Sequence, residues 1–405
     1  MSELTYLEKL LDGVKVEWQT LGKVLKRTKG TKITAGQMKA LHKDNAPLKI
    51  FAGGKTVAFV DFKDIPEKDI NREPSIIVKS RGIIEFEYYD KPFSHKNEMW
   101  SYHSNNDAIS IKYIYYFLKI NEGYFQKIGG KMQMPQIATP DTDKFEVPIP
   151  CPDNPEKSLA IQSEIVRILD KFTALTAELT AELNMRKKQY NYYRDQLLSF
   201  DESSVEWKTL LEACDYVDYR GKTPKKTQSG IFLVTAKNIR MGYIDYHASQ
   251  EFISEEDYAI VMRRGLPKKG DVLITTEAPC GFVAQVNREN IALAQRVIKY
   301  RSKNTQLSNS FLKHYLLGSQ FQDKLMQAAT GSTVKGIKGS RLHQLKIPIP
   351  SKVEQDRIVA ILDKFDTLTN SITEGLPREI ELRQKQYEYY RDLLFSFPKP
   401  ETISN

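Results

Sequence analysis

The same ordered set of short motifs occurs twice in this sequence, and this duplication limits what the chain can fold into. Each copy begins with VEW, continues through a VPIP or IPIP segment and an ILDKF motif, and ends with a KQYxYYRD block. Matching motifs are separated by 189 to 200 residues. This period is far above the roughly 20 to 50 residues of solenoid repeats, so each copy is large enough for its own hydrophobic core. The paired segments are 16–18 with 205–207, 147–150 with 347–350, 165–172 with 358–365, and 188–200 with 385–397.

Each copy changes character at its IPIP segment. The preceding part contains short runs rich in β-branched residues, such as IIV at 76–78 and DVLITT at 271–276, separated by Gly and Pro. Together with helical stretches such as 311–326, this pattern predicts a compact domain of mixed α and β structure. The following part has apolar residues at spacings of three and four, which predict one long helix per copy, at 164–200 and 354–397.

The two long helices are expected to pack on each other. A helix over 164–200 would be about 55 Å long, and one small domain cannot cover its apolar stripe. A pseudo-twofold relation between the copies makes the helices antiparallel, with two unrelated core helices as the alternative. Leu-Leu at 10–11 resembles Leu-Leu at 197–198, so residues 1–13 are interpreted as a displaced tail of the second copy, which brings the termini close together. Four aromatic residues are expected in the core of the helix pair, with a partner-binding surface as the alternative: Tyr190, Tyr193, Tyr387 and Tyr390.

The expected fold belongs to the α+β class. It has two mixed α/β domains separated by an antiparallel coiled coil of two long helices, with an internal pseudo-twofold repeat. The length of 405 residues agrees with two or three hydrophobic cores. The predicted segments are an N-terminal segment 1–13, a first domain 14–150, a central helical spacer 151–203, a second domain 204–350, and a C-terminal helical spacer with a tail, 351–405.

The composition is that of an ordinary globular protein. Hydrophobic residues make up 40% of the chain and charged residues 27%, which excludes a disordered tail or a fibre. The three cysteines are too few and too scattered for a disulfide framework or a CxxC zinc site, so a reducing compartment, the cytoplasm, is expected. No apolar stretch approaches the roughly 18 residues of a membrane helix, and the N-terminus does not resemble a signal peptide, so a secreted or membrane protein is not expected.

The basic excess lies in the two β-rich regions. Of a net charge of +9, region 15–146 carries +6 and region 220–346 carries +12, whereas the two predicted helices together carry −2. A run of charge is usually a solvated face, but a domain at +12 more often meets a polyanion. Two similar basic domains on a rigid spacer suggest two half-sites on one duplex.

Sequence patterns for catalysis are absent. The six histidines show no HExxH or other metal-ligand spacing, and no Gly-rich cofactor fingerprint occurs. There is also no Asn-Pro-Pro-aromatic or Asp-Pro-Pro-aromatic motif for methylating a base amino group. GSTVKGIK at 331–338 has the glycine spacing of a phosphate loop, but Ile337 stands where the lysine must be. This segment is interpreted as a Gly-rich basic turn near a DNA backbone or as a plain loop, and no metal or cofactor is predicted.

The same motifs carry a family resemblance. The doubled IPIP, IVxILDKF and KQYxYYRD blocks, with GLPREI at 375–380, resemble the conserved regions of type I restriction-modification specificity subunits over essentially the whole chain. The resemblance implies two target-recognition domains, each reading one part of a split site in double-stranded DNA. It also implies assembly with two modification (adenine methyltransferase) subunits and with restriction-translocation subunits that use ATP. We therefore interpret the chain as a DNA sequence-specificity subunit that is not itself an enzyme.

Basic and amide side chains of the two domains are the candidate DNA contacts. Arg or Lys can bind guanine bidentately and Asn or Gln can bind adenine, while other Lys and Arg bind phosphates. A solvated surface charge is the alternative for each candidate. The candidates in the first domain are Lys26, Arg27, Lys29, Lys32, Lys55, Arg81, Lys131 and Gln133. Those in the second are Lys222, Lys225, Lys226, Lys237, Asn238, Arg240, Arg296, Lys335 and Lys338.

The first helix departs from the second by a tandem TAEL repeat, at 176–179 and 180–183. The repeat resembles one subgroup of the family, in which it lies in the spacer between the domains. The distance between the domains is therefore expected to depend on Thr176, Leu179, Thr180 and Leu183.

Two other classes of protein are alternatives. A single-chain methyltransferase-nuclease would need the missing cofactor and amino-methylation motifs, and lack of S-adenosylmethionine binding by the isolated chain would exclude it. A free-standing DNA-binding regulator would bind its site tightly alone, whereas a specificity subunit should need its partners for full affinity. The sequence does not predict the target, because base choice depends on side-chain geometry in loops.

Overall fold

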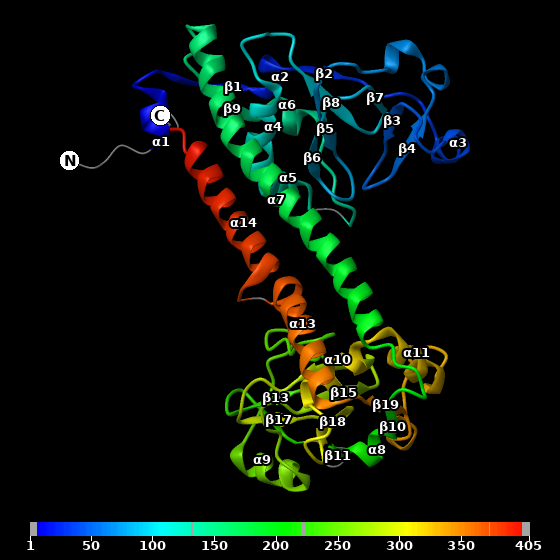
Figure 1. Cartoon of the computed structure of the whole chain (residues 1–405). Helices are drawn as coiled ribbons and strands as arrows, with labels where there is room; N and C mark the ends of the chain where they lie inside the picture. Colours follow the sequence, from blue (N-terminus) through cyan, green and yellow to red (C-terminus); the bar gives the residue numbers. More distant parts are fainter. Residues whose placement is uncertain (1–5, 131–132, 220–223, 372, 399–405) are drawn as a thin grey trace, which may run out of the picture. The chain divides into compact units, whose positions relative to one another are not determined.

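The chain folds into two compact units (Figure 1). The computed structural model describes residues 6–130, 133–219, 224–371 and 373–398. Unit 1 comprises Met1–Thr176 with Arg383–Asn405, and unit 2 comprises Ala177–Leu382. Both divisions fall inside helices, α7 (Pro155–Leu197) and α14 (Gly375–Leu394), so each unit combines one β-rich region with parts of the long helices. None of the described helices is both long enough and apolar enough to cross a membrane.

Unit 1 contains two sheets and a closing strand pair. Its strands are β1 (Val16–Thr20), β2 (Lys26–Thr28), β3 (Leu48–Phe51), β4 (Val57–Val60), β5 (Ser75–Lys79), β6 (Glu85–Tyr89), β7 (Phe93–His95), β8 (Trp100–His103) and β9 (Glu146–Pro150). Its helices include α1 (Tyr6–Leu11), α2 (Leu21–Val24), α3 (Ala35–Leu41), α4 (Ile111–Ile120), α5 (Glu122–Gly129) and α6 (Thr139–Asp143). The larger sheet has the antiparallel order β2-β8-β5-β6, and the smaller has the order β4-β3-β7 with β3 parallel to β7. The antiparallel pair β1–β9 joins the two ends of the β-rich region.

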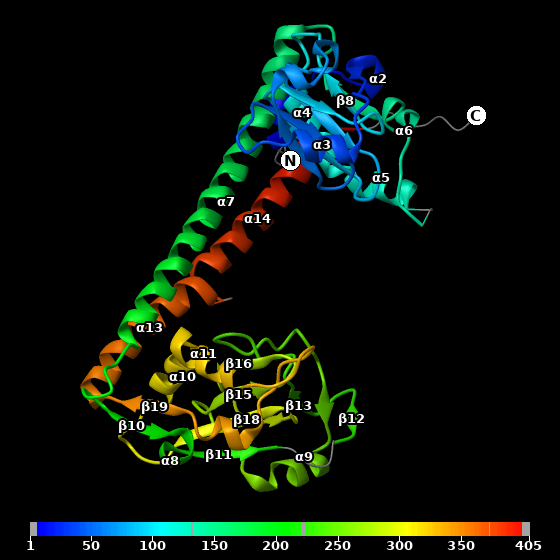
Figure 2. The ribbon, with the colours of Figure 1, turned by 90° about the vertical axis from the view of Figure 1, so that its right-hand side faces the viewer.

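Unit 2 repeats this arrangement. Its strands are β10 (Glu206–Thr209), β11 (Cys214–Asp218), β12 (Lys226–Thr227), β13 (Ile231–Val234), β14 (Phe252–Ile253), β15 (Val272–Thr276), β16 (Cys280–Gln285), β17 (Ile291–Leu293), β18 (Val297–Ser302) and β19 (Lys346–Ile349). Its helices include α8 (Leu210–Ala213), α9 (Glu255–Val261), α10 (Asn309–Leu317), α11 (Ser319–Ala328), α12 (Gly339–Leu342) and α13 (Lys352–Asn370). The larger sheet has the order β11-β18-β15-β16, the smaller β12-β14-β13-β17 with β13 parallel to β17, and β10 pairs with β19. Figure 2 shows α10 and α11 beside the larger sheet.

Apart from β12, which is an additional edge strand of the smaller sheet in unit 2, the two copies share one strand topology, which confirms the predicted duplication and the mixed α and β class. The local signals are shared as well. α4 and α10 each begin after a serine, Ser110 and Ser308, whose hydroxyl accepts a backbone N–H of the first helical turn. The buried amides of Gln162 and Gln355 accept the backbone N–H of these same serines at 2.9 and 2.8 Å. Each cap thus ties the β-rich region to the long helix of its copy.

The end of the second KQYxYYRD block lies in the core of unit 1, and the end of the first lies in the core of unit 2. In unit 1 the rings of Phe395 and Tyr113 of α4 are 5.3 Å apart, and in unit 2 those of Phe200 and Phe311 of α10 are 6.2 Å apart. The end of each copy's helical region thus completes the other copy's core, which is the cyclic arrangement inferred from the sequence. Both ends of the chain supply core residues to unit 1: Leu7, Leu11, Leu394, Phe395 and Phe397.

The prediction of one uninterrupted helix per copy is confirmed for the first copy and wrong for the second. α7 is continuous, but the predicted helix 354–397 is divided into α13 and α14. The break lies between Asn370 and Gly375: the backbone of Ser371 is extended, and Gly375 at the start of α14 has a φ of +75°, where a Cβ would come within 2.4 Å of the Thr367 carbonyl oxygen. The Ser371 hydroxyl accepts two backbone N–H groups in the turn between the helices.

α7 has an antiparallel partner helix in unit 1. Phe172 of α7 stacks on Tyr390 of α14 with ring centroids 5.4 Å apart. Ile165, nearer the start of α7, shares a core with Phe397, which lies beyond the end of α14. The residue order along the two helices is therefore opposite.

In unit 2 the partner of α7 is α13. The tyrosines expected in the core of the helix pair are only partly buried. Tyr190 and Tyr193 stack on Phe365 at 6.0 and 5.8 Å. Tyr190 is 5% exposed, as expected for a core residue. Tyr193 and Tyr390 are 46% and 41% exposed, so these two rings pack with one face and leave the other at the surface.

Candidate nucleic-acid interface

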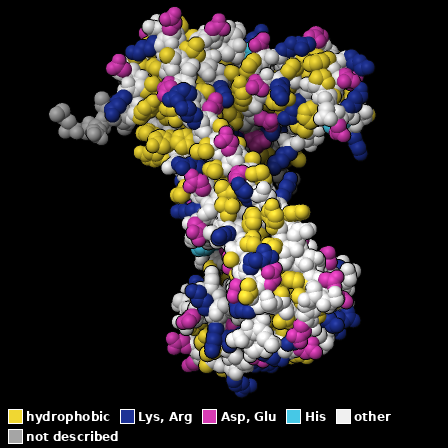
Figure 3. Space-filling model, in the orientation of Figure 1, with side chains coloured by type: hydrophobic (Ala, Val, Ile, Leu, Met, Phe, Trp, Pro, Cys, Tyr) yellow, Lys and Arg dark blue, Asp and Glu magenta, His cyan; other side chains and the backbone are white. Residues whose placement is uncertain are grey.

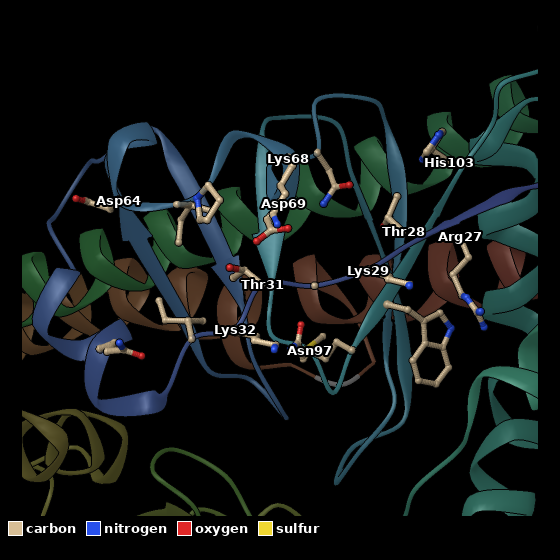
Figure 4. Close-up of a pocket in the computed structure, with 18 of the residues that line it drawn as sticks. Arg27, Thr28, Lys29, Thr31, Lys32, Asp64, Lys68, Asp69, Asn97 and His103 are labelled. Atoms are coloured by element: carbon tan, nitrogen blue, oxygen red, sulfur yellow. The ribbon is translucent and has the colours of Figure 1, made fainter.

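Unit 1 contains a broad basic recess between β2, α3 and the segments that follow β4 and β7 (Figure 4). Its volume is about 1200 Å³. Four candidate residues of the first domain line it, together with one lysine outside the predicted set. These basic residues are Lys26, Arg27, Lys29, Lys32 and Lys68.

The recess depends on the extended segment that follows β2. Gly30 lies so close to β7 that a Cβ would come within 2.5 Å of the His95 carbonyl oxygen. The Thr31 N–H donates to the same carbonyl at 2.8 Å. Only glycine permits this approach, which fixes the path of the chain on both sides. Lys29 and Lys32, on either side of it, both line the recess (Figure 4).

The lysines of the recess are free to bind a polyanion, whereas the guanidinium of Arg27 is already paired with a carboxylate. None of the four lysines forms an ion pair with a described residue. Arg27 pairs with Asp143 at 2.7 Å, and Asp143 also accepts the Tyr102 hydroxyl. Asp64 and Asp69 line the recess too, so its surface is basic but not uniformly positive. A phosphate would meet the lysines directly but would compete with a carboxylate for Arg27.

The recess is also lined by neutral hydrogen-bonding side chains that the sequence analysis did not identify, three amides and one histidine. Amides of this kind can bind adenine bidentately. Burial, and then the positive charge of Lys26, lower the pKa of His103 below its ordinary value, so its imidazole is neutral at pH 7. No motif connects these residues, because separate loops and strands bring them together. They are Gln37, Asn71, Asn97 and His103.

The remaining candidates of the first domain lie outside the recess. Arg81 is in the turn between β5 and β6, where its backbone pairs with Gln136 and its side chain is exposed. Gln133 is exposed in the loop that leads to this contact, and Lys131 lies outside the described residues. Lys55 is exposed in the turn between β3 and β4.

Three candidates of the second domain lie together at the β15–β16 hairpin. Arg296 pairs with Glu277 at 3.6 Å, and the backbone of Glu277 pairs with Gly336 of the Gly-rich segment. Lys335 and Lys338 flank this contact. Both are exposed, and neither forms an ion pair with a described residue.

The Gly-rich segment 331–338 is part of a closed turn. Thr330 and Gly336 exchange both backbone hydrogen bonds, at 2.8 and 2.9 Å. Gly331 has a φ of +112°, and a Cβ there would come within 2.1 Å of the Val334 carbonyl oxygen. The corresponding loop of unit 1 reaches its own hairpin through the pairing of Arg81 with Gln136, so both copies place candidate residues at the same hairpin.

The other candidates of the second domain are more dispersed. Lys226 pairs with Glu251 at 2.9 Å, and Arg240 pairs with Asp245 at 3.5 Å, so both have local partners. Lys225 and Lys237 are exposed and form no ion pair with a described residue, and Lys222 lies outside the described residues.

The prediction that Asn238 contacts DNA is wrong. Its side chain is 0% exposed. Oδ1 accepts the backbone N–H of Thr235 at 2.9 Å, and Nδ2 donates to the carbonyls of Asp245 and Ser249 at 2.9 and 2.8 Å. The amide is fully used inside the fold, where it organises the segment between β13 and β14, and it cannot reach a base.

The four spacer residues lie in the uninterrupted part of α7. The Thr176 hydroxyl donates to the Phe172 carbonyl at 2.9 Å, one turn earlier in the helix. The division between the units falls after Thr176, so the TAEL repeat begins where the chain passes from unit 1 to unit 2. The spacer residues are Thr176, Leu179, Thr180 and Leu183.

Metal-binding geometry is absent from the described part of the chain. No group of three or more His, Cys, Asp or Glu side chains there is arranged to hold a metal ion. The cysteines Cys151, Cys214 and Cys280 are free thiols.

Comparisons with known proteins identify the family. The profile of the type I restriction modification DNA specificity domain matches residues 15–186 and 207–382, one match in each copy. The chain is 44% identical to the type I restriction enzyme EcoR124I/EcoR124II specificity subunit of Escherichia coli, with 100% of both chains covered. It is 36% identical to the EcoprrI specificity subunit of Escherichia coli, over 92% of this chain and 93% of that one. The fold resembles the crystal structure of the S subunit from M. genitalium, with a TM-score of 0.60 at 17% identity over 96% of this chain and 98% of the other. The chain belongs to the family of type I restriction-modification specificity subunits.

Proposed function

We propose that this chain selects the DNA sequence on which a type I restriction-modification complex acts, and that each β-rich domain reads one half of a bipartite site. The observation that carries the proposal is the repetition of one fold with basic residues on each copy; Figure 3 shows Lys and Arg side chains on the visible face of both units. As the specificity subunit, the chain is not itself the enzyme. The recognition domains in this proposal are 14–150 and 204–350, with helical spacers at 151–203 and 351–405.

The proposed DNA contacts divide by chemistry. Exposed candidate lysines without ion pairs in the recess and in the Gly-rich turn bind phosphates, which fixes the domain on the duplex without reading sequence. Amides and arginines near them bind base edges. Gln37 and Asn97 of the recess join the base-reading candidates Arg81, Gln133, Arg240 and Arg296. The phosphate-binding candidates with this character are Lys26, Lys29, Lys32, Lys335 and Lys338.

The duplicated helices supply the proposed docking sites for partner subunits. Tyr192 and Tyr389 have the same position in the two KQYxYYRD blocks and are 62% and 64% exposed. Large aromatic side chains are enriched at protein interfaces. One such position in each unit fits two modification (adenine methyltransferase) subunits, onto which the restriction-translocation subunits assemble. The proposed location of this complex is the cytoplasm.

Phosphate binding by the Gly-rich turn is tested with the double variant Lys335→Ala and Lys338→Ala. In the complex with modification subunits, binding should weaken on all DNA sequences, and the slope of log affinity against log salt should fall by about one unit for each phosphate that is no longer bound. Fluorescence anisotropy with specific and unrelated duplexes measures both. The control is the double variant Lys268→Ala and Lys269→Ala, exposed residues outside the candidate set. A changed sequence preference with an unchanged salt slope would place the two lysines at base edges instead.

Docking is tested by Tyr192→Ala and Tyr389→Ala. Each single variant should lose one modification subunit, because each removes the aromatic centre of one docking site. Native mass spectrometry should show mainly complexes with one modification subunit for the singles and unassembled chain for the double variant. Tyr243→Ala, which removes a tyrosine 39% exposed outside these helices, is the control. Two modification subunits on the double variant would place the docking sites elsewhere.

A further inference from the structure

The smaller sheet of unit 2 carries a recess centred on an arginine that stacks on aromatic rings. The guanidinium carbon of Arg288 lies 3.5 Å from the ring centroid of Tyr246 and 4.8 Å from that of Phe232. The recess has a volume of about 510 Å³. None of these residues is among the sequence candidates, since three separate parts of the chain bring them together.

The rings and the arginine hold one another in place. Phe232 packs edge to face on Tyr246 at 5.3 Å and on Phe252 at 5.5 Å. The Tyr246 hydroxyl donates to Asn287 Oδ1 at 2.7 Å. Asn287 precedes Arg288, so the turn that carries the guanidinium also fixes the ring on which it stacks. A guanidinium held in this way loses little further freedom when it binds a ligand.

The charge of Arg288 is free to meet an anion. The side chain is exposed and forms no ion pair with a described residue, although Glu289 lines the same recess. Stacking occupies one face of the guanidinium, and one N–H group interacts with the Tyr246 hydroxyl. The other N–H groups of the planar fork can bind two phosphate oxygens in a bidentate geometry. The amides of Gln250 and Asn290 line the recess and can donate to further oxygens.

The first copy has a cation, Lys49, at the strand position that Phe232 occupies in the second copy. The central strands β3 and β13 match in register, because Lys49 lies opposite Phe93 and Phe232 lies opposite Ile291, each the first residue of the parallel neighbour strand. Lys49 and Phe232 therefore occupy the same position on the same face of the smaller sheet.

The cation of the first copy is neutralised, whereas Arg288 is not. Lys49 Nζ lies over the Phe51 ring at 4.2 Å, and it forms an ion pair with Glu87 at 3.2 Å. The Lys49 side chain is 17% exposed, so this pair supports the sheet and has little surface to offer. In unit 2 the position of Lys49 is taken by Phe232, one of the two rings under Arg288, and Arg288 is exposed and pairs with no described carboxylate.

We propose that Arg288, supported by Tyr246 and Phe232, binds a backbone phosphate of DNA, as a contact made by the second domain and not by the first. The contact does not depend on base sequence. This inference rests on the proposed function, because it needs the second domain to meet DNA.

The test compares Arg288→Ala, Arg288→Lys and the control Arg263→Ala, an exposed arginine outside the recess. Each chain is assembled with modification subunits, and its affinity is measured on a duplex with the bipartite site and on an unrelated duplex, over a range of salt. Arg288→Ala should weaken binding about tenfold on both duplexes, the effect of one charge-assisted contact. The salt slope should fall by about one unit. Arg288→Lys should recover only part of the affinity, because lysine keeps the charge but not the planar fork.

The variant Glu289→Gln is a second test, in which DNA affinity is expected to rise instead of fall. Removal of a carboxylate beside the phosphate should tighten binding roughly twofold while Arg288 stays in place. Unchanged affinity and slope for Arg288→Ala, with normal binding by the parent complex, would overturn this inference alone. Loss of modification subunits from Arg288→Ala with an unchanged salt slope would assign the arginine to a carboxylate of a partner protein and also overturn it. A parent complex that binds no bipartite site would instead contradict the proposed function.

Discussion

Replacing residues 14–150 with the matching segment of another family member is expected to change one half of the recognised DNA site and leave the other half as it is. The first and last strands of this segment pair with each other in the structure. Its two ends pair as β1 and β9, with Val16 opposite Pro150, and the Cys151 N–H donates to the Lys15 carbonyl at 2.8 Å. A graft joined at these strands enters and leaves the domain at one place. Mapping methylated adenines in a genome that carries the complete system measures the result.

The graft must keep the core that the helices share with the first domain. Tyr113 and Phe117 of α4 contact Phe395, which stays with the recipient chain, so the donor segment should retain large apolar residues at these two positions. The reciprocal exchange of 204–350 is the matched control and should alter only the other half-sequence. A change of both half-sequences after a single exchange would contradict the assignment of one half-site to each domain.

The sequence predicted the parts of the fold that depend on order along the chain. In each copy the VEW and IPIP segments form an antiparallel strand pair, β1–β9 in the first and β10–β19 in the second. The two ILDKF motifs lie within the helices α7 and α13. Apolar spacing alone did not show the break in the second helix. A three- and four-residue pattern continues past Asn370, whereas α13 ends there because the backbone of Ser371 is extended, and α14 begins at Gly375, whose backbone is left-handed.

The candidate site was predicted less well, because it is assembled from distant segments. Lys29 and Lys32 were found from local basic character and do line the recess. Asn97 and Arg288 belong to no basic run, and only the tertiary structure brings them to surfaces with other polar groups. Asn238 shows the opposite error, since an amide beside Lys237 fits a base-reading pattern, yet its hydrogen bonds are all made inside the fold. Residue type predicts what a side chain can bind, and burial decides whether it is available.

Deleting or adding one TAEL unit in α7 is expected to change the gap between the two half-sequences by one base pair. Four helical residues change the spacer by about 6 Å and rotate it by about 40° beyond a whole turn. One base-pair step advances B-DNA by about 3.4 Å and turns it by roughly 34°. The rotation suits one base pair, while the length alone would suit nearly two. We favour one, because a helix inclined to the DNA axis contributes only part of its length.

The structure supports this role for α7 rather than for the second helical path. α7 is one continuous helix across the TAEL repeat, whereas the second helical path is divided into α13 and α14, so we expect a change in length to act through α7. Methylation sites should be mapped for chains with one, two and three TAEL units, with Glu178→Ala as a control that alters the repeat without altering its length. Each half-sequence should stay the same in every variant, because no recognition domain is changed. An unchanged gap in all three would show that residues 176–183 are only a solvated stretch of helix and that the spacing of the domains is set by other contacts.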